Sequence, residues 1–401
     1  MYSQLFTSTR LGETIMNNRY QLDKVVILSR HGIRTPLQNT LEFLEQATPF
    51  KWPKWDHPYG YLTTRGGALE VYFGRYLATW LDNQNLQYTA SPSDVFVYAN
   101  SLQRTVATAQ FLTAGAFAGY DIPIKHKHPI EKMDSIFDPS LRIDSDEFKQ
   151  AVIKDIDETV TAESISKNLA PAFEILADIL DYKHSKFYAQ YQCDLADIPV
   201  EVYLKKHEEP ALLGALAIGV SAVDAFLLQY YSGFSKQQIA WGRINSQAQW
   251  QQLIQIRNQY LNLICRTKTL AKHSATELIN MINNLMHHDD RKIHLLVGHD
   301  STIASLFGAL DFEPYQLPNQ YETTPIGGKV ILQRFRHLES GTHYFKAEYV
   351  YQSFEQLFTG AHISMDNPPQ HFTLQLKNAK QNQDGFYDWH DFEQRLNMFK
   401  G

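Results

Sequence analysis

Two arginines and a histidine lie within five residues of one another in the segment from Arg30 to Pro36, Arg-His-Gly-Ile-Arg-Thr-Pro. Guanidinium groups donate paired hydrogen bonds to oxyanions such as phosphate. Gly32 lets the backbone approach a ligand closely, and Pro36 stiffens the exit from the loop. The segment is therefore a candidate phosphate-binding loop. A basic loop with merely solvated charges is the alternative at this point, because short motifs recur by chance.

A buried strand directly before this segment is the element that must position it. Val25 to Leu28 is an unbroken apolar run, which is typical of a strand covered on both faces. The run gives way to charge at Arg30, so the polar side chains fall at the carboxyl end of the predicted strand. Open α/β sheets bind their ligands at that end. The placement favours a ligand-binding role for Arg30, His31 and Arg34.

A second apolar run, Val95 to Ala99, also ends in polar residues. Ser101 is a natural helix N-cap, and counting from it places Arg104 in the first turn of a following helix. A cation there opposes the helix dipole by roughly 0.3–1 kcal/mol unless an anion lies in front of the helix. The position favours an anion-binding role for Arg104, with an arginine that reaches sideways into water as the alternative.

A third apolar run, His294 to Val297, leads into His299 and Asp300. Three times, then, a buried strand is followed by residues that can hold or transform a phosphate. Parallel strands of one sheet would bring these ends to the same edge. We therefore predict that Arg104, His299 and Asp300 meet the Arg30 loop there.

The wider pattern predicts an α/β fold: a mainly parallel central sheet flanked by helices, with a mostly α-helical cap inserted into the chain. Helical periodicity dominates the middle of the chain, and strand-then-helix alternation precedes it. We expect residues 1–134 and 267–401 to form the α/β domain and residues 135–266 to form the cap. Apolar or alternating runs at Lys329–Phe335, Tyr344–Tyr351 and Phe372–Leu376 predict hairpins that extend one sheet edge.

Composition narrows the function classes. The chain has 401 residues, of which 44% are hydrophobic, and a net charge of -6. This length supports a large core, whereas the negative charge without a long basic run argues against nucleic acid or an anionic membrane as a partner. No apolar run is long enough to span a bilayer. A small-molecule substrate is the expected partner, and a homodimer is compatible with the sequence.

The two cysteines, Cys193 and Cys265, could form at most one disulfide, and free buried thiols are the expectation. Residues 1–20 contain no apolar core of the length that a signal peptide needs. The chain as given is expected in the cytoplasm, with a periplasmic or secreted location as the alternative if a leader was removed. No P-loop, glycine-rich dinucleotide turn or zinc-ligand spacing occurs, so the sequence calls for no cofactor and no metal.

The motif Arg-His-Gly-x-Arg-x-Pro resembles the signature of the histidine acid phosphatases, branch 2 of the histidine phosphatase superfamily. Four other stretches resemble bacterial members of that family: the segment Asn-Ser-Leu-Gln-Arg-Thr around Arg104, the pair His299-Asp300, Val223 to Tyr231, and Thr-Pro-Ile-Gly-Gly-Lys from Thr324. The likeness covers nearly the whole chain. It is greatest to periplasmic glucose-1-phosphatases and next to phytases.

The resemblance implies a metal-independent hydrolysis of phosphomonoesters. His31 would be the nucleophile, forming a phosphohistidine that water then hydrolyses. Asp300 would be the general acid that protonates the leaving alcohol. The phosphoryl oxygens would be bound by Arg30, Arg34, Arg104 and His299, which provide the charge that this reaction requires. A helix N-terminus favours the ionised form of Asp300, whereas a general acid must carry a proton. The dianionic substrate should raise the pKa of Asp300, and we expect the enzyme to have an acid optimum.

The resemblance also suggests the substrate, a sugar phosphate such as glucose 1-phosphate, with inositol hexakisphosphate as the alternative. Asp224, in a predicted helix from Val220 to Gly233, is the polar candidate near the leaving group, unless it only caps or solvates that helix. Thr35 and Thr302 are further substrate-binding candidates. Thr302 stands where those relatives often carry Asn, and their several disulfides have no counterpart here. A phosphohistidine mutase is less favoured because the His-Asp pair and the large insertion are both present. A non-catalytic phosphate-binding protein is less favoured because it would be expected to lack one of the six chemical residues.

Overall fold

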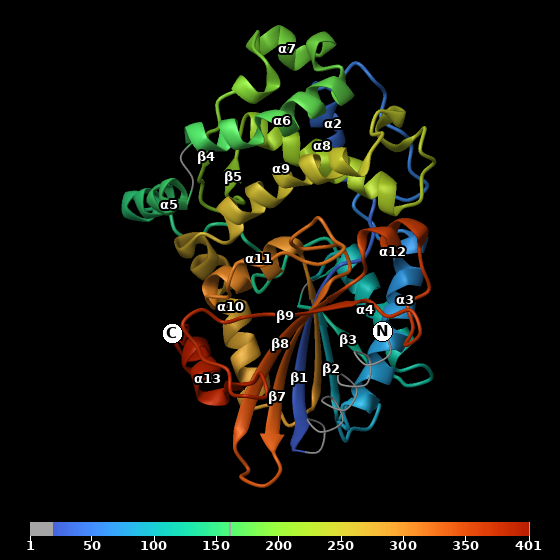
Figure 1. The fold of residues 1–401 in the computed structure, drawn as a ribbon, viewed down its shortest axis with the longest axis vertical. Helices are drawn as coiled ribbons and strands as arrows, with labels where there is room; N and C mark the ends of the chain where they lie inside the picture. Colours follow the sequence, from blue (N-terminus) through green and yellow to red (C-terminus); the bar gives the residue numbers. More distant parts are fainter. Residues whose placement is uncertain (1–18, 128, 160–161, 401) are drawn as a thin grey trace, which may run out of the picture.

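The computed structural model describes residues 19–127, 129–159 and 162–400, and most of the segment examined for a leader falls outside them. These residues contain an eight-stranded sheet with the order β10-β8-β7-β1-β6-β2-β3 and with β9 paired to β8 (Figure 1). The strands are β1 (Tyr20–Arg30), β2 (Val95–Ala99), β3 (Ile124–Lys125), β6 (Ile293–Gly298), β7 (Lys329–His337), β8 (His343–Tyr351), β9 (Gln370–Thr373) and β10 (Tyr387–Asp388).

The sheet is mixed. Strands β1, β6, β2 and β3 are parallel neighbours, which confirms the predicted parallel core. The added strands β7, β8, β9 and β10 are antiparallel, as expected for an edge extended by hairpins. The strand expected over Phe372–Leu376 is displaced toward the N-terminus, because β9 ends at Thr373.

The buried strand β1 separates two hydrophobic cores. Val25 and Ile27 face the core on α3 (Thr64–Asn83) and α4 (Gln103–Ala116). Val26 and Leu28 face the core built on α10 (Lys268–His287), α11 (Asp300–Ala309) and α13 (Trp389–Asn397). Successive side chains of a strand point to opposite faces, so an unbroken apolar run satisfies both cores. The carboxyl end of β1 is thereby fixed between two helical layers.

Helix α3 is held close to the loop that follows β1. The side chain of Thr63 caps the helix by accepting a hydrogen bond from the N–H of Gly66 at 3.0 Å. A Cβ atom on Gly66 would lie 2.4 Å from the carbonyl oxygen of Ile33, and one on Gly74 would lie 2.1 Å from that of Leu112. Only glycine permits such backbone contacts. They pack α3 against α4 and against the residue before Arg34.

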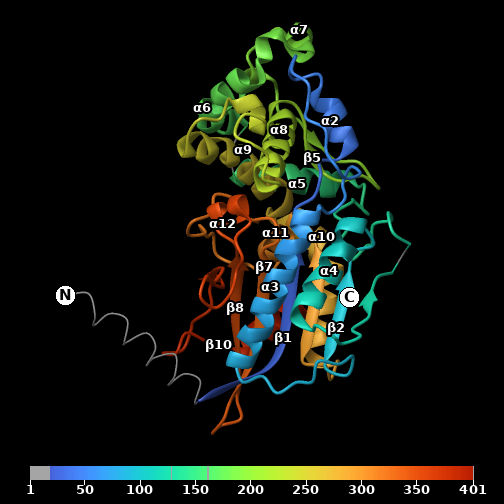
Figure 2. The ribbon, with the colours of Figure 1, turned by 90° about the vertical axis from the view of Figure 1, so that its right-hand side faces the viewer.

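A helical layer lies over the carboxyl ends of the parallel strands (Figures 1 and 2). It contains α5 (Asp146–Thr159), α6 (Ala162–Leu180), α7 (Lys186–Tyr191), α8 (Ala215–Tyr231) and α9 (Gln247–Cys265), with the hairpin β4 (Val202–Tyr203) and β5 (Ala211–Leu212). Helix α2 (Gln38–Leu44) packs into its separate core, and α12 (Phe354–Thr359) lies below it in Figure 1. None of the described helices has the length and apolar character that a membrane crossing requires.

Candidate active site

His31 directly follows β1 and is 3% exposed. Its N–H donates to the carbonyl oxygen of Gly298 at 3.0 Å, which continues the pairing of β1 with β6. The ring Nδ1 lies 2.9 Å from the carbonyl oxygen of Gly32. A carbonyl oxygen can only accept a hydrogen bond, so Nδ1 carries the proton and the lone pair of the neutral ring is on Nε2. This geometry leaves Nε2 as the nitrogen that can attack an electrophile.

The His31 ring is kept neutral by its surroundings. Burial is the largest effect that holds its pKa well below the usual histidine range, followed by the positive charges of Arg104 and Arg30. Both effects disfavour the imidazolium form. The ring therefore retains its nucleophilic lone pair in mildly acidic solution.

Arg104 lies in the first turn of α4, as predicted. The helix begins at Gln103 with Leu102 at the N-cap position, so the prediction that Ser101 is the N-cap is wrong. The N–H of Ser101 donates to the side-chain oxygen of Asn100 at 2.8 Å, in the turn that precedes the helix. The buried Nε of Arg104 makes no hydrogen bond to any described residue. Burial, followed by the charge of Arg34, lowers its pKa to about 10, and an anion in front of α4 would relieve both.

His299 faces His31, with the two ring centroids 5.5 Å apart and the rings nearly perpendicular. Its Nε2 lies 2.6 Å from the side-chain nitrogen of Asn100. The side-chain oxygen of Asn100 accepts hydrogen bonds from the N–H groups of Ser101 and Asp134, so its amide nitrogen must point to His299. Nε2 is then the acceptor, and Nδ1–H of the neutral ring is the remaining donor.

Asp300 is the first residue of α11, and its side chain is 25% exposed. Its carboxylate contacts the guanidinium of Arg257 and lies 3.2 Å from Nη2 of Arg30. Burial alone would raise the pKa of this carboxyl, but the charges of Arg30 and Arg257 hold it well below the usual range. Asp300 is therefore ionised in the ligand-free protein.

Arg30 is buried, and two acceptors hold one of its terminal nitrogens. Its Nη1 donates to the carbonyl oxygen of Thr324 at 2.7 Å and to Glu322 at 3.2 Å. Glu322, with a side chain only 1% exposed, also pairs with Arg257 at 3.2 Å and accepts from the hydroxyl of Tyr231 at 2.7 Å. This network fixes the guanidinium of Arg30 at the end of β1.

Arg257 and Glu322 were absent from the sequence-predicted site. Arg257 extends from α9 and is 2% exposed. It interrupts an apolar stripe that runs from Trp250 through Leu253 to Ile264, and a charge within such a stripe is a signal that could have identified it. Glu322 lies in a loop with no periodic pattern, so no comparable signal marks it.

Arg34 and Asp224 meet across the boundary between the sheet and the helical layer. Nη2 of Arg34 donates to Asp224 at 3.0 Å. Asp224 lies on α8, which spans Ala215–Tyr231 and so begins earlier than the helix expected from Val220 to Gly233. A cavity of about 290 Å³ opens here, and its wall includes Arg34, Asp224, Arg257, Asp300 and Glu209. Glu209 was also missed, because nothing in its local sequence distinguishes it.

Thr35 and Thr302 have structural partners. The hydroxyl of Thr35 donates to the carbonyl oxygen of Pro58 at 2.6 Å. The hydroxyl of Thr302 accepts from the N–H of His299 at 3.1 Å and completes a capping box at the start of α11. Both side chains support the loops of the site, and their contact with a substrate stays a prediction.

A buried ion pair, Lys329–Glu70, supports the backbone of the loop that contains His31. Nζ of Lys329 lies 2.9 Å from Glu70 and donates to the carbonyl oxygen of Gly327 at 2.6 Å. The N–H of Gly327 in turn donates to the carbonyl oxygen of His31 at 3.0 Å. Both charged side chains are at most 3% exposed. The structure thus connects Lys329, from the Thr-Pro-Ile-Gly-Gly-Lys segment, to the backbone of His31.

The six residues predicted to carry out the reaction thus lie together at the carboxyl ends of the parallel strands, below α8 and α9. Among residues 19–127, 129–159 and 162–400, no group of three or more His, Cys, Asp or Glu residues is arranged to hold a metal ion. The positive charge at the site comes from the four arginines: Arg30, Arg34, Arg104 and Arg257. The arrangement can bind a tetrahedral oxyanion, place Nε2 of His31 behind it, and place a carboxyl group beside it.

Comparison with known proteins identifies the family of this site. The sequence profile of the histidine phosphatase superfamily (branch 2) matches residues 21–350. Glucose-1-phosphatase of Providencia rettgeri is 42% identical over 381 residues, which cover 93% of this chain and 90% of that protein. Phytase AppA of Escherichia coli (strain K12) is 27% identical over 402 residues, 94% of this chain and 91% of that protein. The structure of Hafnia alvei phytase in complex with myo-inositol hexakis sulphate superimposes with a TM-score of 0.87 and 28% identity, covering 95% of this chain and 98% of that chain.

Proposed function

The chain belongs to branch 2 of the histidine phosphatase superfamily and is a histidine acid phosphatase, and from this premise we propose that its substrates are compact sugar phosphates such as glucose 1-phosphate. The resemblance drawn from the sequence is confirmed by the family match. The residue roles and the preferred substrate are our proposal, and the site geometry supports them as follows.

In the first step, Nε2 of His31 attacks phosphorus while the oxygen of the leaving alcohol departs. Hydrogen bonding of Nδ1 to Gly32 and the lowered pKa of the His31 ring supply a neutral, correctly protonated nucleophile. The equatorial oxygens are held by Arg30, Arg34, Arg104 and Nδ1–H of His299, which neutralise the developing charge.

Asp300 supplies the proton to the leaving oxygen. The carboxyl group is ionised in the free enzyme, and the incoming phosphate brings negative charge beside it. A nearby like charge raises the pKa of a carboxyl group, so substrate binding promotes uptake of the proton at acid pH. In the second step, the Asp300 carboxylate accepts a proton from the water that attacks the phosphohistidine, and inorganic phosphate leaves.

The observation that carries the substrate proposal is the pair of carboxylates in the small cavity beside Asp300. Asp224 and Glu209 line this space of about 290 Å³. Carboxylates accept hydrogen bonds from sugar hydroxyls but repel additional phosphate groups, which an inositol polyphosphate carries all round its ring. A compact neutral leaving group therefore fits this wall better than phytate does.

The test compares kcat/KM for glucose 1-phosphate and for phytate in the wild type and in Asp224→Ala. Because Asp224 also pairs with Arg34, the substitution will weaken phosphate binding for both substrates, so the ratio is the informative quantity. We expect the wild type to favour glucose 1-phosphate and the variant to lose part of that preference. A wild type that prefers phytate, or an unchanged ratio, contradicts the proposal.

The wider organisation belongs to the same proposal. Residues 1–134 and 267–401 form the phosphatase domain, and residues 135–266 form a cap that contributes Asp224, Glu209 and Arg257. Small phosphomonoesters are the expected partners, and nucleic acid is not. Light scattering tests for a homodimer.

Cys193 and Cys265 are both free, so the fold needs no oxidising compartment. A cytoplasmic location is consistent with this, and fractionation distinguishes it from the periplasm.

A further inference from the structure

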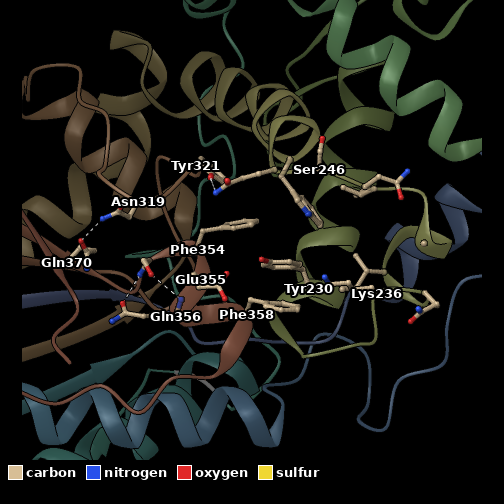
Figure 3. Close-up of a pocket in the computed structure, with 18 of the residues that line it drawn as sticks. Tyr230, Lys236, Ser246, Asn319, Tyr321, Phe354, Glu355, Gln356, Phe358 and Gln370 are labelled. Carbon is tan, nitrogen blue, oxygen red and sulfur yellow. Dashed lines mark hydrogen bonds between the residues drawn. The ribbon is translucent and has the colours of Figure 1, made fainter. Parts of the chain in front are cut away.

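A second cavity, of about 920 Å³, lies between the helical layer and the α12 region of the α/β part (Figure 3). Its walls come from the end of α8, the segment 236–250, the loop 319–321 and the segment 353–370. None of the residues proposed above to act in catalysis lines it. The volume is in the range of sites that hold a ligand larger than a single small ion.

The polar part of the wall is mainly amide. Gln247, Asn319, Gln370 and other Asn and Gln residues line the space, together with Tyr321. An amide donates and accepts hydrogen bonds with equal ease, as does a sugar hydroxyl. The charged residues of the wall are Lys236 and Glu355, which have opposite signs. A phosphate or other strong anion would require a cluster of cations that this wall lacks.

The apolar part of the wall is aromatic. The ring of Tyr230 stacks on Phe354 at 4.6 Å and on Phe358 at 4.2 Å between centroids, with interplanar angles of 21° and 22°. Tyr321 lies 4.8 Å from Phe354 on the same side. Tyr230, Tyr321 and Phe358 are only partly buried and border the cavity. Figure 3 shows the rings of Phe354, Tyr230 and Phe358 stacked on one another, with the amides of Asn319, Gln356 and Gln370 to one side of the stack.

We propose that this cavity is a binding site for a neutral carbohydrate, separate from the phosphate site. A sugar ring has an apolar C–H face and a rim of hydroxyls that both donate and accept. The partly exposed rings of Phe358 and Tyr321 match the first, and uncharged amides match the second. The proposal rests on the lining of this cavity and does not depend on the substrate of the phosphatase site.

The position of the cavity gives such a ligand access to the catalytic network. Tyr321 precedes Glu322, and Tyr230 precedes Tyr231, whose hydroxyl donates to Glu322 at 2.7 Å. Glu322 in turn pairs with Arg30 at 3.2 Å. Both aromatic walls are therefore one residue away from groups that fix the proposed phosphate ligand Arg30.

The test is calorimetric titration of the full-length enzyme with maltose and with cellobiose, in the presence of saturating inorganic phosphate to occupy the phosphatase site. We expect saturable binding of at least one disaccharide. Phe358→Ala removes an aromatic face and Gln247→Ala removes an exposed amide, and each should weaken binding roughly three- to tenfold. Turnover of glucose 1-phosphate without disaccharide should be unchanged in Gln247→Ala, which reports that the variant is folded.

Matched controls are Tyr120→Ala, an aromatic that is 61% exposed, and Gln383→Ala, an exposed amide, neither of which lines the cavity. Both controls should bind the disaccharide as the wild type does. The proposal is overturned if neither disaccharide binds at concentrations of tens of millimolar. It is also overturned if Gln247→Ala and Phe358→Ala bind normally, or if phosphate abolishes binding, because the ligand would then occupy the phosphatase site.

Discussion

Replacing Arg257 by methionine should cost the protein stability as well as activity. The guanidinium is 2% exposed, contacts Asp300 and lies 3.2 Å from Glu322, whose side chain is 1% exposed. Methionine retains most of the apolar volume but leaves these carboxylates with one positive neighbour fewer. Removing one partner of a buried ion pair costs about 3–5 kcal/mol.

The magnitude should fall near the lower end of that range, about 3 kcal/mol of unfolding free energy. Glu322 keeps Arg30 at 3.2 Å and the Tyr231 hydroxyl at 2.7 Å. Asp300 is 25% exposed, so water can replace part of the lost interaction. Arg257→Lys keeps the charge without the planar fork and should lose less than Arg257→Met.

Urea unfolding of Arg257→Met, Glu322→Gln and the double variant measures this coupling. The double variant should be less destabilised than the sum of the singles by about 1–3 kcal/mol, because both substitutions remove the same interaction. Arg75→Met, an exposed arginine on α3, is the control and should change stability by no more than about 0.5 kcal/mol. Additive losses, or a loss below about 1 kcal/mol in Arg257→Met, would refute the reasoning.

Three further predictions concern the chemistry and its support. Asp300→Asn should lower kcat for glucose 1-phosphate by about 10²- to 10⁴-fold but affect p-nitrophenyl phosphate, whose leaving group needs no proton, much less; equal losses in steady-state assays would assign Asp300 another role. Because the pKa of His31 lies well below its usual range, the wild-type pH profile of kcat/KM should show no loss of activity from a group that titrates near 6.5. Arg104→Met removes the largest charge effect on His31 and should move the acid limb of that profile to higher pH. An acid limb that does not move contradicts this assignment. Lys329→Met should destabilise the protein by about 3–5 kcal/mol by leaving Glu70 buried and unpaired, and adding Glu70→Met should recover much of the loss in thermal unfolding; no recovery would mean that the pair is not the cause.

The elements that carry the phosphate-binding residues could be predicted because their sequence signals are local. An apolar run that is buried on both faces must be followed by polar residues where it leaves the core, and this places His31, Arg104 and Asp300 at strand ends or at helix starts. The buried apolar face of α3, from Leu69 to Trp80, is likewise a local pattern of helical spacing. The antiparallel edge strands were also expected, although β9 was displaced.

The supporting network could not be predicted in the same way, because it depends on contacts between distant segments. Asn100 is recognisable as a partner of His299 only when β2 and β6 are neighbours. Glu322 lies in a loop that is distant from β1 in the sequence, and only the fold brings it into contact with Arg30. The N-cap prediction at Ser101 failed because α4 starts one residue later, with Leu102, which has no capping side chain, at the N-cap position.

The measurement that tests the central claim most directly is rapid-quench trapping of a phosphoenzyme. Wild-type enzyme mixed with radiolabelled glucose 1-phosphate in a single turnover should carry acid-labile, base-stable phosphate on a peptide that contains His31. His31→Ala should carry no label and should have no turnover while keeping its fold by circular dichroism. An unlabelled wild type under these conditions, or appreciable activity in His31→Ala, would contradict the account.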